Sequence, residues 1–148
     1  MTLSSKQSIN YHKNGHVIRR TILLNAPITR VWEALATSEG LAAWLLPNNF
    51  QPLVGASFVF KAVPQDHWDG VVACQVMAID APHKLTFTWS EDAQLLPTLL
   101  TFELYELNGQ TEVCLVHSQR EHLPEDHVSK LDQGWGCDML RRLAELFG

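Results

Sequence analysis

The sequence from residue 124 to residue 147, PEDHVSKLDQGWGCDMLRRLAELF, is the longest stretch of this chain with one helical period. Pro124 and the two acidic residues after it suit a first helical turn. The apolar residues recur at steps of three and four, as on one face of a helix; they are Val128, Leu131, Trp135, Met139, Leu143 and Leu146, with Leu140 and Phe147 widening the stripe. We therefore predict one amphipathic helix roughly 35 Å long, which needs a broad apolar surface to lie on.

Two glycines interrupt the interior of this predicted helix, Gly134 and Gly136, on either side of Trp135. Each glycine inside a helix costs about 1 kcal/mol relative to alanine, so a helix that only packs would not need them. They indicate either a close approach of the helix to a sheet or space beside Trp135 for a ligand.

The apolar pattern changes to a period of two between residues 53 and 118, and it is clearest in LTFTWS at residues 85–90. One-sided strands of this kind, joined by short turns, are typical of an antiparallel sheet with one solvated face, and Asn108-Gly109 is a strong hairpin signal. The alternating apolar sets are Phe58/Phe60/Ala62, Val72/Cys74/Val76, Leu85/Phe87/Trp89, Leu100/Phe102/Leu104 and Val113/Leu115/His117.

The first third of the chain predicts three further elements. Residues 16–25 favour a strand, and residues 28–36 and 41–46 two short helices, the second stopped by Pro47. Residues 1–15 are polar and lack a period, so we expect a flexible N-terminal arm followed by a single domain over residues 16–148. The fold class is α+β: a curved antiparallel sheet wraps the long C-terminal helix, and the gap between them is a natural place for an apolar cavity.

Composition narrows the function classes. The chain has 148 residues, enough for one domain with its own core. Its formal net charge of -5 argues against nucleic-acid or anionic-membrane binding. No apolar run is long enough to span a bilayer, and Cys74, Cys114 and Cys137 are odd in number and widely spaced. We expect a cytoplasmic protein with free thiols.

Several motifs of the chain form a recognisable set. They are NAPITRVWEAL at 25–35, LAAW at 41–44 with Pro47, PHKLTFTW at 82–89, GQTEVCLVH at 109–117 and GW at 134–135. Together they resemble the SRPBCC or START-like superfamily, whose members have the helix-grip fold. The branch that the chain resembles most is related to activators of the heat-shock protein 90 ATPase. The chain departs from the family pattern at residues 118–120, SQR, where a glycine-aromatic pair often follows the His117 position.

The resemblance implies the helix-grip fold and leaves the function open. Eukaryotic members of the branch bind the chaperone and stimulate its ATPase, usually with an additional N-terminal domain. Other members of the wider superfamily bind lipids, hormones or polyketides, or catalyse cyclisation. Fold alone does not choose among these activities.

Aromatic residues at inward positions are the best candidates to line a ligand site, because aromatic rings stack on flat or apolar molecules. The alternative is that they only fill the core. The predicted lining residues are Trp44, Phe58, Phe60, Phe87, Trp89, Phe102, His117, Trp135 and Met139, with Arg20 added as a polar contact.

His117 and Arg20 are the polar candidates for the interior, where they could orient a ligand carboxylate or carbonyl. The alternative places both at strand ends, hydrogen-bonded or reaching solvent. We identify no catalytic set and expect no cofactor. His117, His122 and His127 are five residues apart, which matches no known ligand spacing, so we predict no metal site.

Three functions follow as hypotheses. The first is binding of a small apolar molecule between the sheet and the C-terminal helix. The second is a chaperone-interacting module that stimulates a heat-shock ATPase, and the third a cyclase-like or hydrolytic enzyme using His117 and Arg20.

Overall fold

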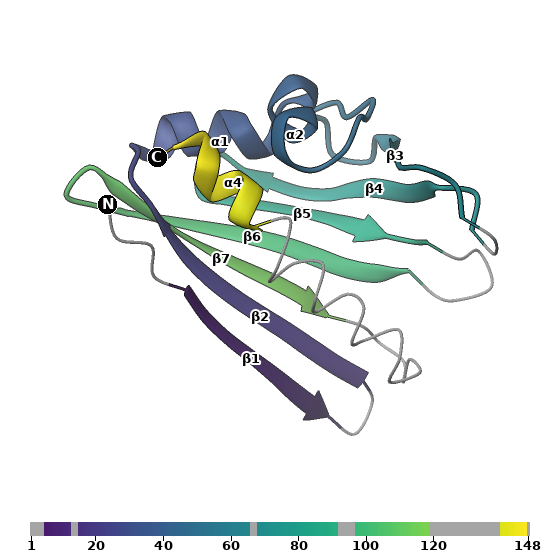
Figure 1. Ribbon diagram of the computed structural model, residues 1–148, viewed down its shortest axis with the longest axis horizontal. Helices are drawn as coiled ribbons and strands as arrows, with labels where there is room; N and C mark the ends of the chain where they lie inside the picture. Colours follow the sequence, from purple (N-terminus) through teal and green to yellow (C-terminus); the bar gives the residue numbers. More distant parts are fainter. Residues whose placement is uncertain (1–4, 13–14, 66–67, 92–96, 119–139, 148) are drawn as a thin grey trace.

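A computed structural model describes residues 5–12, 15–65, 68–91, 97–118 and 140–147 of the chain. Its centre is a curved antiparallel sheet of seven strands, in the order β1-β2-β7-β6-β5-β4-β3 (Figure 1). The strands are β1 (Ser5–His12), β2 (Gly15–Leu24), β3 (Ser57–Lys61), β4 (Val71–Asp80), β5 (Lys84–Trp89), β6 (Thr98–Leu107) and β7 (Gln110–Ser118). This architecture confirms the predicted α+β helix-grip fold.

The five strands β3 to β7 follow the predicted alternation. In β6, for example, Leu100, Phe102 and Leu104 are fully buried, whereas the residues between them are partly exposed. The β6–β7 turn is the predicted hairpin: Leu107 pairs with Gln110, and Asn108 and Gly109 both have positive φ. That geometry is the reason Asn-Gly is favoured in two-residue hairpin loops.

Two short helices follow β2 and cover part of the inner face: α1 (Ile28–Leu35) and α2 (Ser38–Trp44). Pro27 precedes α1 and has no side chain that can cap it. Instead, the Ile28 amide donates a 2.8 Å hydrogen bond to Oε2 of Glu106, at the far end of β6. The start of α2 is capped locally, because Thr37 Oγ1 accepts from the amide of Gly40 at 2.9 Å.

Of the predicted C-terminal helix, the described part is α4 (Leu140–Leu146), which contacts α2 and β2 (Figure 1). Leu140, Leu143 and Ala144 are buried in the core that the sheet and the first two helices share. Leu146 is 41% exposed, so its assignment to the buried stripe is wrong. The rest of the prediction, residues 124–139, lies outside the described residues.

The N-terminal arm is the clearest difference from expectation. Residues 5–12 form strand β1, paired with β2 in a register that runs from Ser5 opposite Ile22 to His12 opposite Gly15. A strand at the edge of a sheet gains backbone hydrogen bonds from its neighbour whatever its side chains are. The lack of an apolar period in residues 1–15 therefore did not exclude a strand there.

Helices α1, α2 and α4 are all short, with eight, seven and seven residues. None of the helices within the described ranges is long and apolar enough to cross a membrane.

Candidate functional site

Three phenylalanines, two from β3 and one from β5, form the centre of an aromatic cluster on the inner face of the sheet. Phe58 of β3 lies with its ring centroid 5.3 Å from that of Phe87 of β5, and Phe60 lies 6.0 Å from Phe87. Phe58 and Phe60 themselves meet edge-on at 5.4 Å. Edge contacts such as those that Phe58 makes are a favoured geometry of aromatic pairs. The predicted inward positions therefore do meet in one place.

Two more of the predicted aromatic residues extend the cluster toward α2. Phe102 of β6 lies 6.1 Å from Phe87, and Trp44 of α2 meets Phe102 edge-on at 6.2 Å. The indole Nε1 of Trp44 donates a 2.8 Å hydrogen bond to the carbonyl of Ala34 in α1. This bond satisfies the polar atom of a fully buried tryptophan and ties α2 to α1.

Phe50 belongs to the same cluster and was missed in the sequence. Its ring meets that of Phe58 edge-on at 5.1 Å. It lies in the irregular segment between α2 and β3, where no period marks inward positions. The local signal is Asn48, whose Oδ1 accepts a 2.9 Å hydrogen bond from the Phe50 amide, because asparagine commonly bonds the backbone two residues ahead in turns.

The rings at the centre of the cluster are packed against protein on all sides. Phe60, Phe87 and Phe102 have no exposed surface, so no space as large as a water molecule adjoins them. These three rings support the sheet and its helices. Whether a ligand contacts any ring of the cluster stays a prediction.

A row of polar and aromatic side chains crosses the inner face beside this cluster, with one residue from each of four adjacent strands. In spatial order they are Trp89 of β5, Thr98 of β6, His117 of β7 and Arg20 of β2. Arg20 is 7% exposed, Thr98 5% and His117 3%, so the row lies inside the protein. The two polar candidates from the sequence are thus both buried.

The strand register fixes the spacing along this row. Trp89 is paired directly with Thr98, while His117 is opposite Leu100, two residues along β6 from Thr98. Arg20 is opposite Leu115, two residues along β7 from His117. Neighbours displaced by two residues on one face are about 7–8 Å apart and within reach of long side chains.

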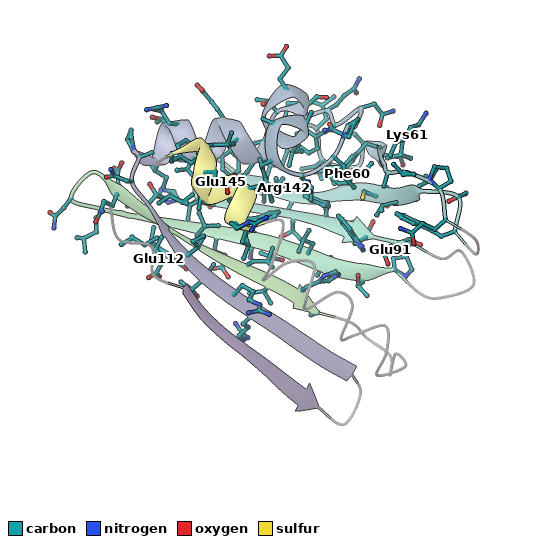
Figure 2. All side chains as sticks on the ribbon, in the orientation of Figure 1. Phe60, Lys61, Glu91, Glu112, Arg142 and Glu145 are labelled. Atoms are coloured by element: carbon teal, nitrogen blue, oxygen red, sulfur yellow. The ribbon has the colours of Figure 1, made fainter. Side chains whose placement is uncertain are left out.

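Hydrogen bonds join the first three members of the row. Thr98 Oγ1 donates to the carbonyl of Trp89 at 3.1 Å and is also bonded to Nε2 of His117. The His117 ring meets the Trp89 ring edge-on, with centroids 6.1 Å apart. The Trp89 indole in turn donates to Oε1 of Glu91 at 3.2 Å; Glu91 lies near the end of β5, on the right in Figure 2. Thr98 was missed in the sequence, because a threonine that opens a strand is unremarkable there.

The side chains of the row differ in what they offer to a hydrogen bond. Arg20 offers only donors, whereas an imidazole offers a donor and an acceptor. Within the described residues, no three His, Cys, Asp or Glu side chains are grouped so as to hold a metal ion. His122 and His127 lie outside those residues, as do the predicted lining residues Trp135 and Met139.

The cysteines that the structure describes, Cys74 and Cys114, are free thiols. Cys74 lies on the inner face of β4, opposite Phe58. Burial disfavours the thiolate and raises the pKa of the Cys74 thiol far above its ordinary value.

This burial predicts a loss of stability at alkaline pH. The Cys74 thiol loses its proton near pH 8.5 in the unfolded chain but keeps it in the folded one, so the free energy of unfolding falls as pH rises above that value. The expected slope from this group approaches about 1.4 kcal/mol per pH unit. Urea unfolding between about pH 7.5 and pH 9.5 should show a smaller loss for Cys74→Ala than for the wild type. Equal losses would contradict the assignment.

Comparisons with known proteins agree with this architecture. The family model described as "Activator of Hsp90 ATPase homolog 1-like protein" matches residues 25–148. No curated protein matches the chain.

Among solved structures, protein BH1534 of Bacillus halodurans is similar at 32% identity and a TM-score of 0.73, over 89% of this chain and 96% of that one. Protein MLL2253 of Mesorhizobium loti is 26% identical, with a TM-score of 0.70, over 85% and 95% of the two chains. The Aha1 dimer from Colwellia psychrerythraea shares the fold at 20% identity and a TM-score of 0.72, over 88% and 95%. The resemblance drawn from the motifs is confirmed, and the chain belongs to the family of Activator of Hsp90 ATPase homolog 1-like proteins.

Proposed function

We propose that this protein binds a small, largely apolar molecule on the inner face of its sheet, in the cytoplasm, with the polar end of that molecule at Arg20 and His117. The observation that carries the proposal is the buried row of Trp89, Thr98, His117 and Arg20 beside an aromatic cluster. Aromatic and apolar surroundings with a few convergent polar groups are typical of small-molecule sites.

The burial of Arg20 supports this reading. A guanidinium taken out of water loses several kcal/mol of solvation, and an apolar side chain of similar volume at the same place is often neutral or stabilising. A buried guanidinium therefore needs acceptors for its donors. Its planar fork of donors suits recognition of a carboxylate or carbonyl oxygen.

The packed rings limit the size of the ligand. The ring centroids of Phe60 and Trp89 are 5.5 Å apart. These two rings and that of Phe87 form a packed aromatic surface, which we call the floor, next to the polar row. A molecule that reaches Arg20 and His117 then lies over this floor rather than within it. This arrangement favours a compact ligand with one polar end.

The neighbouring arginine provides a matched control for the test. Arg19 is exposed on the outer face of β2, and Arg20 is buried on the inner face. We expect Arg20→Met to weaken binding at least about 10-fold, because a hydrogen bond to a charged group contributes about 1.5–3 kcal/mol. Arg19→Met should bind like the wild type. Native mass spectrometry of each protein, purified from its own host, measures the bound mass.

Thermal melting of the three proteins checks that they are folded. Undiminished bound mass in Arg20→Met would contradict the role of Arg20. A wild type that carries no bound mass and binds nothing in a screen of apolar compounds would contradict the function itself.

Family membership favours a second candidate, a module that acts on an Hsp90-type chaperone. The match to the family model covers most of the chain, residues 25–148. On this proposal the protein stimulates the ATPase of the chaperone from its own host. Steady-state ATPase rates measured with increasing amounts of the protein decide it, and unchanged rates at high excess dismiss it.

A further inference from the structure

We propose that Asn108, in the turn of the β6–β7 hairpin, is a site of non-enzymatic deamidation, and that the iso-aspartate formed there loosens the hold of the hairpin on the start of helix α1. Neither step requires a ligand on the inner face of the sheet. Both rest on the chemistry of the turn and on two hydrogen bonds between the hairpin and the start of α1.

The reaction joins two neighbouring residues of the turn. The backbone nitrogen of Gly109 attacks the side-chain carbonyl carbon of Asn108, so that a new C–N bond forms. The bond to the side-chain nitrogen breaks, and ammonia leaves with the proton of the Gly109 nitrogen. Water then opens the cyclic imide at either of its two carbonyl groups. One opening gives aspartate, and the other gives iso-aspartate, whose backbone runs through the side chain and is one carbon longer.

The surroundings of Asn108 leave this attack unhindered. Asn108 is exposed, and its carboxamide makes no hydrogen bond to the described part of the chain. Gly109 has no Cβ that could block the approach, and no described atom lies within 4 Å of the place where a Cβ would be. Ring closure requires the turn to leave its positive-φ geometry, and exposed loop tips open locally at little cost.

Other asparagines with described side chains are better protected. The Asn48 carboxamide donates to two backbone carbonyls, at 3.1 and 3.0 Å, and accepts from a backbone amide at 2.9 Å. The carboxamide oxygen of Asn49 accepts from a backbone amide at 2.8 Å. Asn25 is exposed, but it is followed by Ala26, whose methyl group hinders attack by its backbone nitrogen. Asn108 is therefore the described asparagine most open to deamidation.

The turn lies next to the contacts that hold the start of α1. Glu106 and Thr111 are paired directly across the hairpin, close to the turn. Glu106 Oε2 accepts from the Ile28 amide at 2.8 Å, and Thr111 Oγ1 donates to the Ala26 carbonyl at 2.8 Å. The length of a hairpin loop fixes the register of the strands that it joins. One extra backbone carbon in a two-residue loop thus displaces this pair and weakens the cap of α1.

The site is tested by storing the purified protein for several weeks in warm, mildly alkaline buffer and mapping its peptides by mass spectrometry. Deamidation raises the mass of a peptide by one unit, and fragmentation beside the extra carbon distinguishes iso-aspartate from aspartate. We expect iso-aspartate at position 108 before any forms at Asn25, Asn48 or Asn49. An Asn108 that stays intact, or that reacts later than any of these three, would overturn the assignment.

The effect on α1 is tested by hydrogen exchange of the Ile28 amide, measured by NMR on the deamidated protein. This amide should exchange at least about 10-fold faster than in fresh protein, because its bond to the Glu106 carboxylate is weakened. Glu106→Ala should reproduce the faster exchange without storage. An unaltered Ile28 amide in protein with iso-aspartate at position 108 would overturn the link between the turn and α1.

Asn108→Gly is the matched control, because Gly-Gly also suits a two-residue hairpin loop and has no side chain that can react. After the same storage, its Ile28 amide should exchange as in fresh protein. This control also accounts for Asn14-Gly15, the other dipeptide of this kind in the chain. Asn108→Asp adds the charge on an unchanged backbone and should leave the exchange nearly unaltered. Fast exchange in either variant would overturn the role of the extra backbone carbon.

Discussion

Replacing Phe87 with alanine is expected to lower the free energy of unfolding by about 3–5 kcal/mol. The ring is completely buried and lies 5.3–6.1 Å from three others, those of Phe58, Phe60 and Phe102. Truncation removes apolar burial and the favourable edge contacts, and leaves a cavity that rigid neighbours cannot fill. Domains have about 5–15 kcal/mol of stability in total, so this loss is a large fraction of it. The melting temperature should fall by roughly 10–15 °C.

Urea unfolding followed by tryptophan fluorescence measures this loss. Phe87→Leu should lower the free energy of unfolding clearly less than Phe87→Ala, because leucine fills most of the volume of the phenylalanine side chain. Leu107→Ala provides an exposed control, since Leu107 is 73% exposed on β6, and it should change stability by less than about 0.5 kcal/mol. A Phe87→Ala protein as stable as Leu107→Ala would show that the aromatic cluster does not support the fold.

Replacing Gly70 with alanine is expected to cost about 2–5 kcal/mol. Gly70 precedes β4 and has a φ of +80°, in the region that disfavours side chains. A Cβ atom there would also lie 2.4 Å from the carbonyl oxygen of Ala62. The contact is with backbone, and the Ala62 amide bonds the Gly70 carbonyl at 2.7 Å, so relief requires the end of β3 and the start of β4 to separate.

Gly55→Ala separates the two causes of this loss. Gly55 has a similar φ of +90°, but no atom of the described residues lies within 4 Å of the position of its Cβ. The free energy of unfolding of this variant should fall only by the cost of placing a side chain at positive φ, about 1–2 kcal/mol. Chemical unfolding of both variants measures the difference, and equal losses would contradict a role for the close approach to Ala62.

The alternation of apolar residues was sufficient to place the inner face of β3 to β7. Phe58, Phe87 and Trp89 are inside because successive side chains of a strand point to opposite faces. No long-range knowledge is needed for that assignment. The Asn108-Gly109 turn was equally predictable, since its positive φ values are a local property of those two residues.

Long-range pairing was not predictable from local pattern. Thr98 and His117 are 19 residues apart, and whether they meet depends on the register between β6 and β7. The cap that Glu106 supplies to α1 joins residues 78 positions apart in the chain. Strand β1 formed against expectation because its partner, rather than its own composition, stabilises it.

The sequence by itself determined the order of the elements from β2 to β7, the inward aromatic residues of β3, β5 and β6, and the family, because periodicity and turn chemistry are local properties of the chain. Only the tertiary structure decided that Trp89, Thr98, His117 and Arg20 form one buried row. Their meeting depends on which strands are neighbours and in what register. Backbone hydrogen bonds between distant segments set both, and no single segment of the chain encodes them.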